Sequence, residues 1–110
     1  MTKSIEEQLL DLARDRFYNG YDPHSTPTLH VVSRGATTWR VVISKYDYCF
    51  AQSGSDWAEH NILYGTVTLD GDHVDSHELQ HHHEWMSERQ AEGYKPDETV
   101  SWLMKKVAES

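Results

Sequence analysis

The chain has 110 residues, of which 37% are hydrophobic and 25% charged, and its net charge is −8. This length favours one domain, residues 1–110, around a single core, and the four Trp, six Tyr and two Phe residues can fill that core. The negative charge disfavours direct binding to nucleic-acid phosphates. No apolar run approaches the ~20 residues of a membrane span, and the N-terminus lacks the pattern of a secretory signal, so we expect a cytoplasmic protein that does not bind membranes.

The N-terminal segment has the pattern of an amphipathic helix at about residues 4–19. Ser4 and Glu7 have the spacing of a capping box, and Gly20 is a suitable stop after the helix. The apolar residues recur at helical spacing and are Ile5, Leu9, Leu12, Ala13 and Phe17. We therefore expect one face of this helix to pack on the core.

Three segments are then rich in β-branched and aromatic residues, and we expect strands at about residues 28–33, 38–51 and 61–69. In the second segment Trp39, Val41 and Ile43 share one parity, whereas Tyr46, Tyr48 and Phe50 take the other. A change of face near Ser44 is the expected cause. Between the second and third strands, residues 56–59 could begin a short helical turn.

Two helices are predicted to follow. Asp75 and Glu78 have the spacing of a second capping box, which opens a helix at about residues 75–91 that stops before Gly93. Pro96 suits the first position of a last helix at about residues 96–108. The order α-β-β-β-α-α predicts an α+β fold, with an antiparallel three-stranded sheet and all helices packed on one face, in two layers.

The predicted helix at 75–91 contains the pattern His-Glu-x-x-His, from His77 through Glu78 to His81. On a helix, two histidines four residues apart can share a zinc ion, and the glutamate can act as general base on a metal-bound water. A zinc-dependent hydrolase is therefore one hypothesis. A third ligand would have to come from elsewhere, and the candidates are Glu84, Glu92, Glu98 and His60.

Two features of the predicted helix weaken that hypothesis. Glu78 already has a structural role as the third residue of the capping box. A helical projection places His77 and His81 on the side opposite Leu79 and Met86, away from the core. We therefore expect no cofactor and treat zinc, with ligands His77, His81 and Glu84, as the alternative.

Residues 70–110 hold ten acidic residues against Arg89, Lys95, Lys105 and Lys106, a net charge of −6. Such a surface favours a basic partner. The preferred hypothesis is a small, non-enzymatic module that occupies a basic site on a larger, nucleic-acid-handling protein, as inhibitors, phage anti-defence proteins and immunity proteins do. A homo-oligomer is a further possibility. The predicted contact residues are Asp70, Asp72, Asp75, His77, His81, Glu84, Trp85, Glu88 and Glu92.

Histidine is concentrated in the same segment, at positions 73, 77, 81, 82 and 83. Protonation of these five side chains would offset much of the acidic charge between Asp70 and Glu92. We therefore expect affinity for a basic partner to fall as the pH drops from about 7 to about 5.5.

Overall fold

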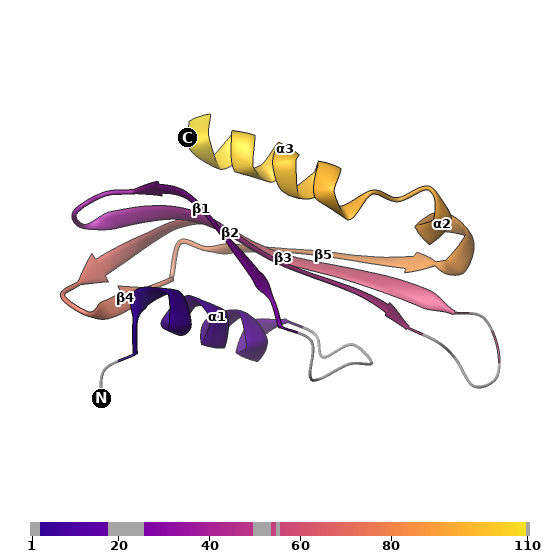
Figure 1. The fold of residues 1–110 in the computed structure, drawn as a ribbon, viewed down its shortest axis with the longest axis horizontal. Helices are drawn as coiled ribbons and strands as arrows, with labels where there is room; N and C mark the ends of the chain where they lie inside the picture. The colour runs from indigo at the N-terminus through magenta and orange to yellow at the C-terminus, as the bar shows by residue number, and fades with distance from the viewer. Residues whose placement is uncertain (1–2, 18–25, 50–53, 55, 110) are drawn as a thin grey trace.

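The structure is a computed structural model that describes residues 3–17, 26–49, 54 and 56–109. Its elements in chain order are α1 (Ile5–Arg16), β1 (Thr28–Arg34), β2 (Thr38–Cys49), β3 (Trp57–Asp70), β4 (His73–Asp75), β5 (Gln80–Ser87), α2 (Glu88–Glu92) and α3 (Pro96–Glu109). The five strands form one antiparallel sheet in which β2 lies between β1 and β3. β4 and β5 share the outer edge of β3 (Figure 1).

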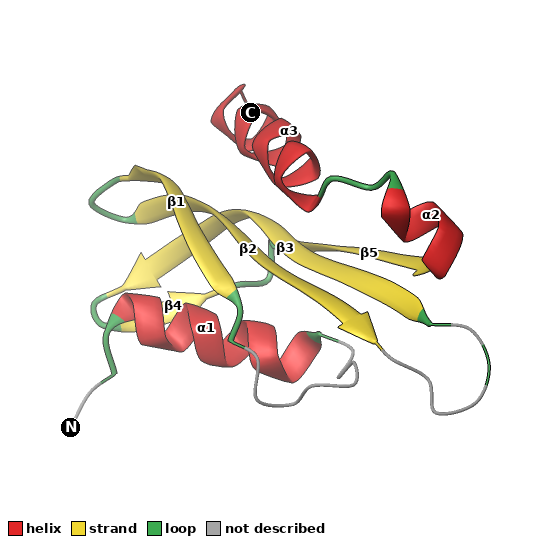
Figure 2. Ribbon diagram, turned by 45° about the vertical axis from the view of Figure 1, so that its right-hand side comes forward, coloured by secondary structure: helices red, strands yellow, loops and turns green. Residues whose placement is uncertain are grey.

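Helices cover both faces of this sheet. Figures 1 and 2 show α1 on one face, called here the α1 face, and α2 and α3 on the other, called the α3 face. The predicted antiparallel α+β fold is confirmed. The three predicted strands are present as β1, β2 and β3, but the sheet has five strands, and the helices lie on both of its faces instead of one. The consecutive residues Val41, Val42 and Ile43 are all fully buried, as expected for a strand that is covered on both sides.

Apolar side chains form a separate core on each face. On the α1 face, Leu9, Ala13 and Phe17 pack against residues of the sheet that include Ile43 and Leu63. The cluster between α3 and the sheet contains Val42, Ile62, Val100, Leu103 and Val107. A third, smaller cluster next to α2 contains Ala58, Met86 and Ala91. Each helix is therefore held by its own apolar stripe.

β2 does not change face near Ser44. Its residues pair with β3 without interruption from Thr38 to Cys49, so Val42, Tyr46 and Tyr48 all lie on the α3 face. The two parities of apolar residues exist because both faces are covered. Phe50 lies outside the described residues, and the helical turn predicted at residues 56–59 is instead the start of β3.

The predicted helix at 75–91 is the main error of the sequence prediction. The chain forms β4, a turn, β5 and only then the short α2. Asp75 does accept a backbone hydrogen bond, but from His77 at 3.1 Å, which makes a local turn instead of a helix cap. Histidine is a modest helix former and tryptophan favours strands, and pairing with β5 satisfies the backbone of β3 from Trp57 to Tyr64.

Gly65 lies in β3, opposite the gap between the residues that pair with β4 and those that pair with β5. Its φ of +134° is rare for residues with a side chain, and a Cβ there would lie 3.2 Å from the carbonyl oxygen of Glu78. This glycine therefore allows the turn at residues 76–79 to pass close to the backbone of β3.

The first and last helices are confirmed. The Ser4 side chain accepts a hydrogen bond from the Glu7 backbone at 3.1 Å, as a capping box requires. The observed α3 ends one residue beyond the predicted 108. The predicted stop at Gly20 lies outside the described residues. Among the helices of the described ranges, none has the length and apolar character of a membrane span.

Candidate functional site

The predicted contact residues do not form one surface, because the helix that would have joined them is absent. β4 pairs with β3 at Thr68–Asp70, whereas the end of β5 pairs with β3 near Trp57. β3 has 14 residues, so its ends are about 40 Å apart at ~3.3 Å per residue. We call the first region the hairpin end, which holds Asp70, Asp72, Asp75 and His77. The second is the α2 end, which holds Glu88 and Glu92.

The remaining predicted contact residues lie on β5 and are divided between the two faces. His81 is paired with Leu63 and Trp85 with Glu59, which places both on the α1 face. Glu84 is paired with His60 and lies on the α3 face. A single partner surface cannot include all three side chains without reaching around the edge of the sheet.

At the hairpin end the Asp75 carboxylate has a structural partner, and α1 binds the backbone of the hairpin. The Nδ1 atom of His77 lies 2.7 Å from the Asp75 carboxylate, and this hydrogen bond raises the pKa of His77 and lowers the pKa of Asp75. The side chain of Gln8 in α1 binds the backbone of Asp72 and accepts from the backbone of Val74 at 3.2 Å. The hairpin is thereby attached to α1.

The α2 end has a different composition. Tyr48 of β2 is 38% exposed, and the pKa of its hydroxyl is raised by burial first and then by the negative charges of Glu88, Asp56 and Glu92. Two of these carboxylates come from α2, and the third, Asp56, directly precedes β3. Arg89 is exposed on the same helix and offsets only part of the charge. The result is an exposed aromatic ring within an acidic surface.

A capping box fixes the orientation of α2. The Ser87 side chain accepts from the Gln90 backbone at 3.3 Å, and the Gln90 side chain accepts from the Ser87 backbone at 3.0 Å. Glu88 consequently occupies the first turn, where a carboxylate is favoured by the helix dipole. This short helix therefore presents its acidic residues in a defined place.

A largely buried set of hydrogen bonds lies on the α3 face, on the same face of β2 as Tyr48. The Ser44 Oγ atom lies 2.7 Å from Nε2 of His60, and Nδ1 of His60 is hydrogen-bonded to the Tyr94 hydroxyl. Tyr46 packs against both rings, with centroid distances of 5.7 Å to His60 and 5.9 Å to Tyr94. Burial lowers the pKa of His60 to about 4 and raises the pKa of Tyr94 to about 12.

The hydrogen-bonded residues Ser44, His60 and Tyr94 are better suited to a structural role than to catalysis. A serine and a histidine at this separation resemble a nucleophile with its base, but Ser44 is 8% exposed and His60 is fully buried. An imidazole with a pKa near 4 is also a weak base. Their hydrogen bonds instead anchor Tyr94, which lies between α2 and α3. Sequence reasoning had treated His60 as a possible zinc ligand.

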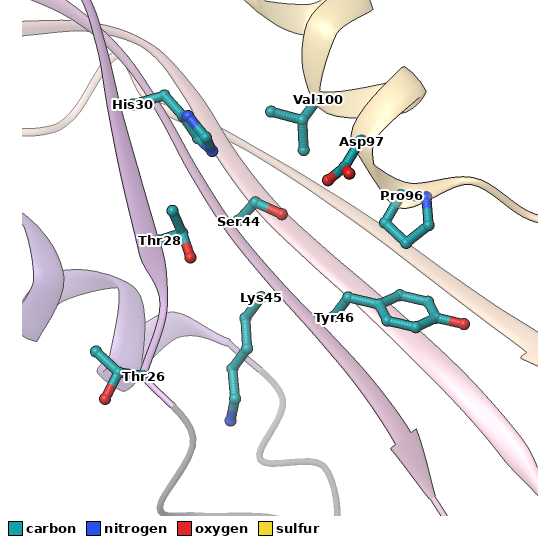
Figure 3. Close-up of a pocket in the computed structure, with 9 residues that line it drawn as sticks. All are labelled: Thr26, Thr28, His30, Ser44, Lys45, Tyr46, Pro96, Asp97 and Val100. Atoms are coloured by element: carbon teal, nitrogen blue, oxygen red, sulfur yellow. The ribbon is translucent and has the colours of Figure 1, made fainter.

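A cavity of about 290 Å³ lies between the N-terminus of α3 and strands β1 and β2. Figure 3 shows Thr28, His30, Ser44, Tyr46 and Asp97 around it, while the Lys45 side chain is directed away from α3. Its wall is therefore hydroxyl-rich and includes one carboxylate. Since Tyr46 lines this cavity and Tyr48 follows on the same face of β2, the cavity adjoins the α2 end.

The histidines of β5 have partners within the protein. Nε2 of His81 lies 3.0 Å from Oδ1 of Asn61, and the His81 ring stacks on Phe17 at 5.6 Å. Burial lowers the pKa of His81. His83 lies 3.7 Å from the Glu59 carboxylate on the same face, and His82 lies 2.9 Å from Glu84 on the other face.

The structure removes the geometric argument for zinc. His77 and Glu78 lie in an exposed turn and His81 lies in a strand, so the two histidines do not share a helical face. Within residues 3–17, 26–49, 54 and 56–109, no three His, Cys, Asp or Glu side chains are grouped closely enough to hold a metal ion. The described residues therefore do not fit the hydrolytic zinc site that the motif predicted.

No protein-family model, curated protein or solved structure matches this chain. The functional argument must come from the surface of the molecule itself. The α2 end differs from an ordinary solvated surface because it combines acidic residues with the exposed Tyr48 ring.

Proposed function

We propose that this protein is a small, acidic, non-enzymatic module whose α2 end binds a basic surface on a larger protein. The supporting observation is the exposed Tyr48 ring, on whose hydroxyl the negative charges of Glu88, Asp56 and Glu92 act. An arginine or lysine of a partner can lie over a tyrosine ring and pair with a neighbouring carboxylate at the same time. Solvated acidic residues alone give no such combination.

The α2 end is also held in place before any partner arrives. The capping box of α2, the packing of Ala91 beside Met86, and the anchoring of Tyr94 on His60 all fix the helix against the sheet. A surface that is already ordered loses less conformational entropy on binding. This rigidity favours a contact role for the acidic groups.

The proposed surface differs from the one predicted from sequence. It keeps Glu88 and Glu92, and it adds Tyr48 of β2 and Asp56, which directly precedes β3. Its aromatic residue is Tyr48 and not the predicted contact residue Trp85, because Trp85 lies on the opposite face of the sheet. The acidic residues of the hairpin end, together with His77 and His81, lie outside it.

The chemistry of the surface also suggests what its binding would do. A basic site that accepts this module is one that otherwise binds an anion, such as a nucleic-acid phosphate. Occupation of that site by carboxylates would block the anion. The proposed class is therefore an inhibitor of a nucleic-acid-handling protein, of the kind found among anti-defence and immunity proteins, acting in the cytoplasm.

Two charge-reversed variants used as baits test this proposal. The variant Glu88→Lys/Glu92→Lys alters the α2 end, and Asp70→Lys/Asp72→Lys makes the same charge change at the hairpin end. We expect a partner from the source cells to bind the wild type and the hairpin variant, and to be lost from the α2 variant. A partner that is retained by the α2 variant and lost from the hairpin variant would refute the proposal.

A further inference from the structure

Strand β5 forms an open edge of the sheet. Gln80 to Ser87 pair on one side with β3, and in the described part of the chain no strand pairs with the other side. In an antiparallel ladder the backbone groups of alternate residues point to opposite neighbours. About half of the backbone N–H and C=O groups of β5 are therefore directed outward, where another strand can bind them.

The opposite edge of the sheet, β1, is protected in ways that β5 is not. β1 has a register shift between Val31 and Ser33 and ends in Arg34, and bulges and charged residues both discourage edge pairing. β5 pairs with β3 in unbroken register over eight residues and contains no lysine, arginine or proline. Only one of the two edges therefore remains suited to strand addition.

Side chains along β5 are also accessible. The main packing of α1 is on β1, β2 and β4, and that of α3 is on β1, β2 and β3. Apart from His81, which stacks on Phe17 at the end of α1, β5 therefore lies beyond the main packing of both long helices. Trp85 is 60% exposed. A groove of about 450 Å³ runs beside it and is lined by His83, Glu84, Met86, Gln90 and Tyr94. A large exposed indole on an open edge strand is typical of a contact surface.

We propose that β5 pairs with β5 of a second copy of this chain, antiparallel, about a twofold axis that passes through His83. The two sheets then join into one. In this register His82 faces Glu84 of the second copy, and His81 faces Trp85 of the second copy. Each exposed Trp85 ring acquires an imidazole neighbour, and each Glu84 carboxylate acquires an imidazole across the junction.

The side chains select this register over its neighbours. An axis perpendicular to the sheet keeps the α1 layers of both copies on the same side, and it requires residues of equal parity to face each other. Moving the axis to Glu84 would place two carboxylates directly opposite, which is unfavourable. Moving it to His82 would pair Trp85 with Leu79, which is buried in the core of the α1 face.

A junction of two eight-residue edges is smaller than a standard protein interface, so we expect a dissociation constant on the order of 10–100 µM. Sedimentation velocity over a concentration series should show a reversible monomer–dimer equilibrium. A wild-type protein that stays monomeric across that range would overturn the proposal.

Disulfide trapping tests the register. In a Cys49→Ala background, which removes the sole native cysteine, His83→Cys places two thiols opposite each other at a Cα separation of ~4.5–5.5 Å, within disulfide reach. We expect disulfide-linked dimers under mild oxidation. Trp85→Cys is the matched control, because its two thiols would lie four residues apart along the strands, beyond disulfide reach. Cross-linking of Trp85→Cys but not of His83→Cys would contradict the proposed axis.

Charge exchange gives an independent test. Glu84→Arg should weaken dimerisation about tenfold, whereas His82→Glu/Glu84→Arg should restore it, because the exchanged charges face each other again. Failure of the double variant to recover would count against the pairing. The Glu88→Lys/Glu92→Lys variant should dimerise normally. The proposed dimer and the proposed partner site at the α2 end can therefore be refuted independently of each other.

Discussion

The hairpin end and the α2 end are both acidic, but their carboxylates have different surroundings. At the hairpin end Asp75 binds His77, and Gln8 ties the hairpin to α1. At the α2 end the charges of three carboxylates act on the hydroxyl of an exposed aromatic side chain. The comparison indicates that negative charge alone does not distinguish a contact surface from a solvated one. We propose that an exposed aromatic side chain near the charges marks the contact surface.

The two ends also respond to pH in opposite directions. The pKa of His60, which anchors the α2 end, lies at about 4, below its ordinary value of 6.5, so the folded state binds its proton less readily than the unfolded state. Its stabilising contribution is present above about pH 6.5 and is lost as the pH falls towards 4. We expect a loss of about 3 kcal/mol in the free energy of unfolding over that range.

Urea unfolding at about pH 7.5 and about pH 5 measures the part of this loss that falls above pH 5, about 2 kcal/mol. His60→Gln should be less stable than the wild type at the higher pH and should show a flatter pH dependence. His73→Gln, at an exposed position of the hairpin end, should keep the wild-type slope. An unchanged slope in His60→Gln would show that another group causes the acid sensitivity.

Charge reversal sharpens the comparison at the level of binding. Glu88→Lys/Glu92→Lys should lower affinity for the partner about 30-fold at low ionic strength, and the difference from the wild type should shrink at higher salt. Asp70→Lys/Asp72→Lys should change affinity less than about threefold. Calorimetric titration of both variants at two salt concentrations provides the measurement, and equal losses would remove the distinction between the ends.

Replacement of the aromatic ring should have a somewhat smaller effect. Tyr48→Thr keeps a residue that favours strands and should weaken partner binding about tenfold. Trp102→Ala is the control, because Trp102 is 59% exposed on α3, outside the proposed surface. If the two variants bind equally well, Tyr48 is not the anchor.

The smallest effect should come from His77. Its pKa is raised by Asp75, so its contribution to stability is present below the ordinary histidine pKa and is lost as the pH rises through the raised value. Because the pair is exposed, His77→Ala should alter the free energy of unfolding less than His60→Gln does. Unfolding curves at the same two pH values test this, and a larger effect of His77→Ala would contradict the assignment.

The sequence was sufficient to predict the local elements whose signals agree with one another. Ser4 and Glu7 supply a cap and α1 has one apolar stripe, and Pro96 begins α3 with a second stripe. Neither helix needed information from distant parts of the chain. Fold class also followed from the strands that succeed one another over short turns.

The β5 region was mispredicted because a local signal and a distant one disagree there. Asp75 and Glu78 match a capping box, but the unpaired edge of β3 offers the segment eight backbone partners. Sequence spacing does not reveal that edge. The predicted contact surface was therefore wrong as well, because most of its residues were placed on a helix that does not form.

Two other features had signals that could have been used. Val41, Val42 and Ile43 are consecutive apolar residues, as in strands covered on both faces, and so indicate a third layer. His60 shares its parity with Ala58 and Ile62, both fully buried, which places it in a core instead of a metal site. Tyr48, by contrast, is brought near Glu88 and Glu92 only when the sheet forms, and no sequence pattern links these residues.

We propose that the α2 end, and not the hairpin end, recognises basic groups. An NMR titration of ¹⁵N-labelled protein with an arginine-rich peptide at moderate salt distinguishes the two ends. We expect saturable shifts centred on the amides of Tyr48, Glu88 and Glu92, with little change between Asp70 and Asp75. Shifts centred on the hairpin end, or equal shifts at both ends, would contradict it.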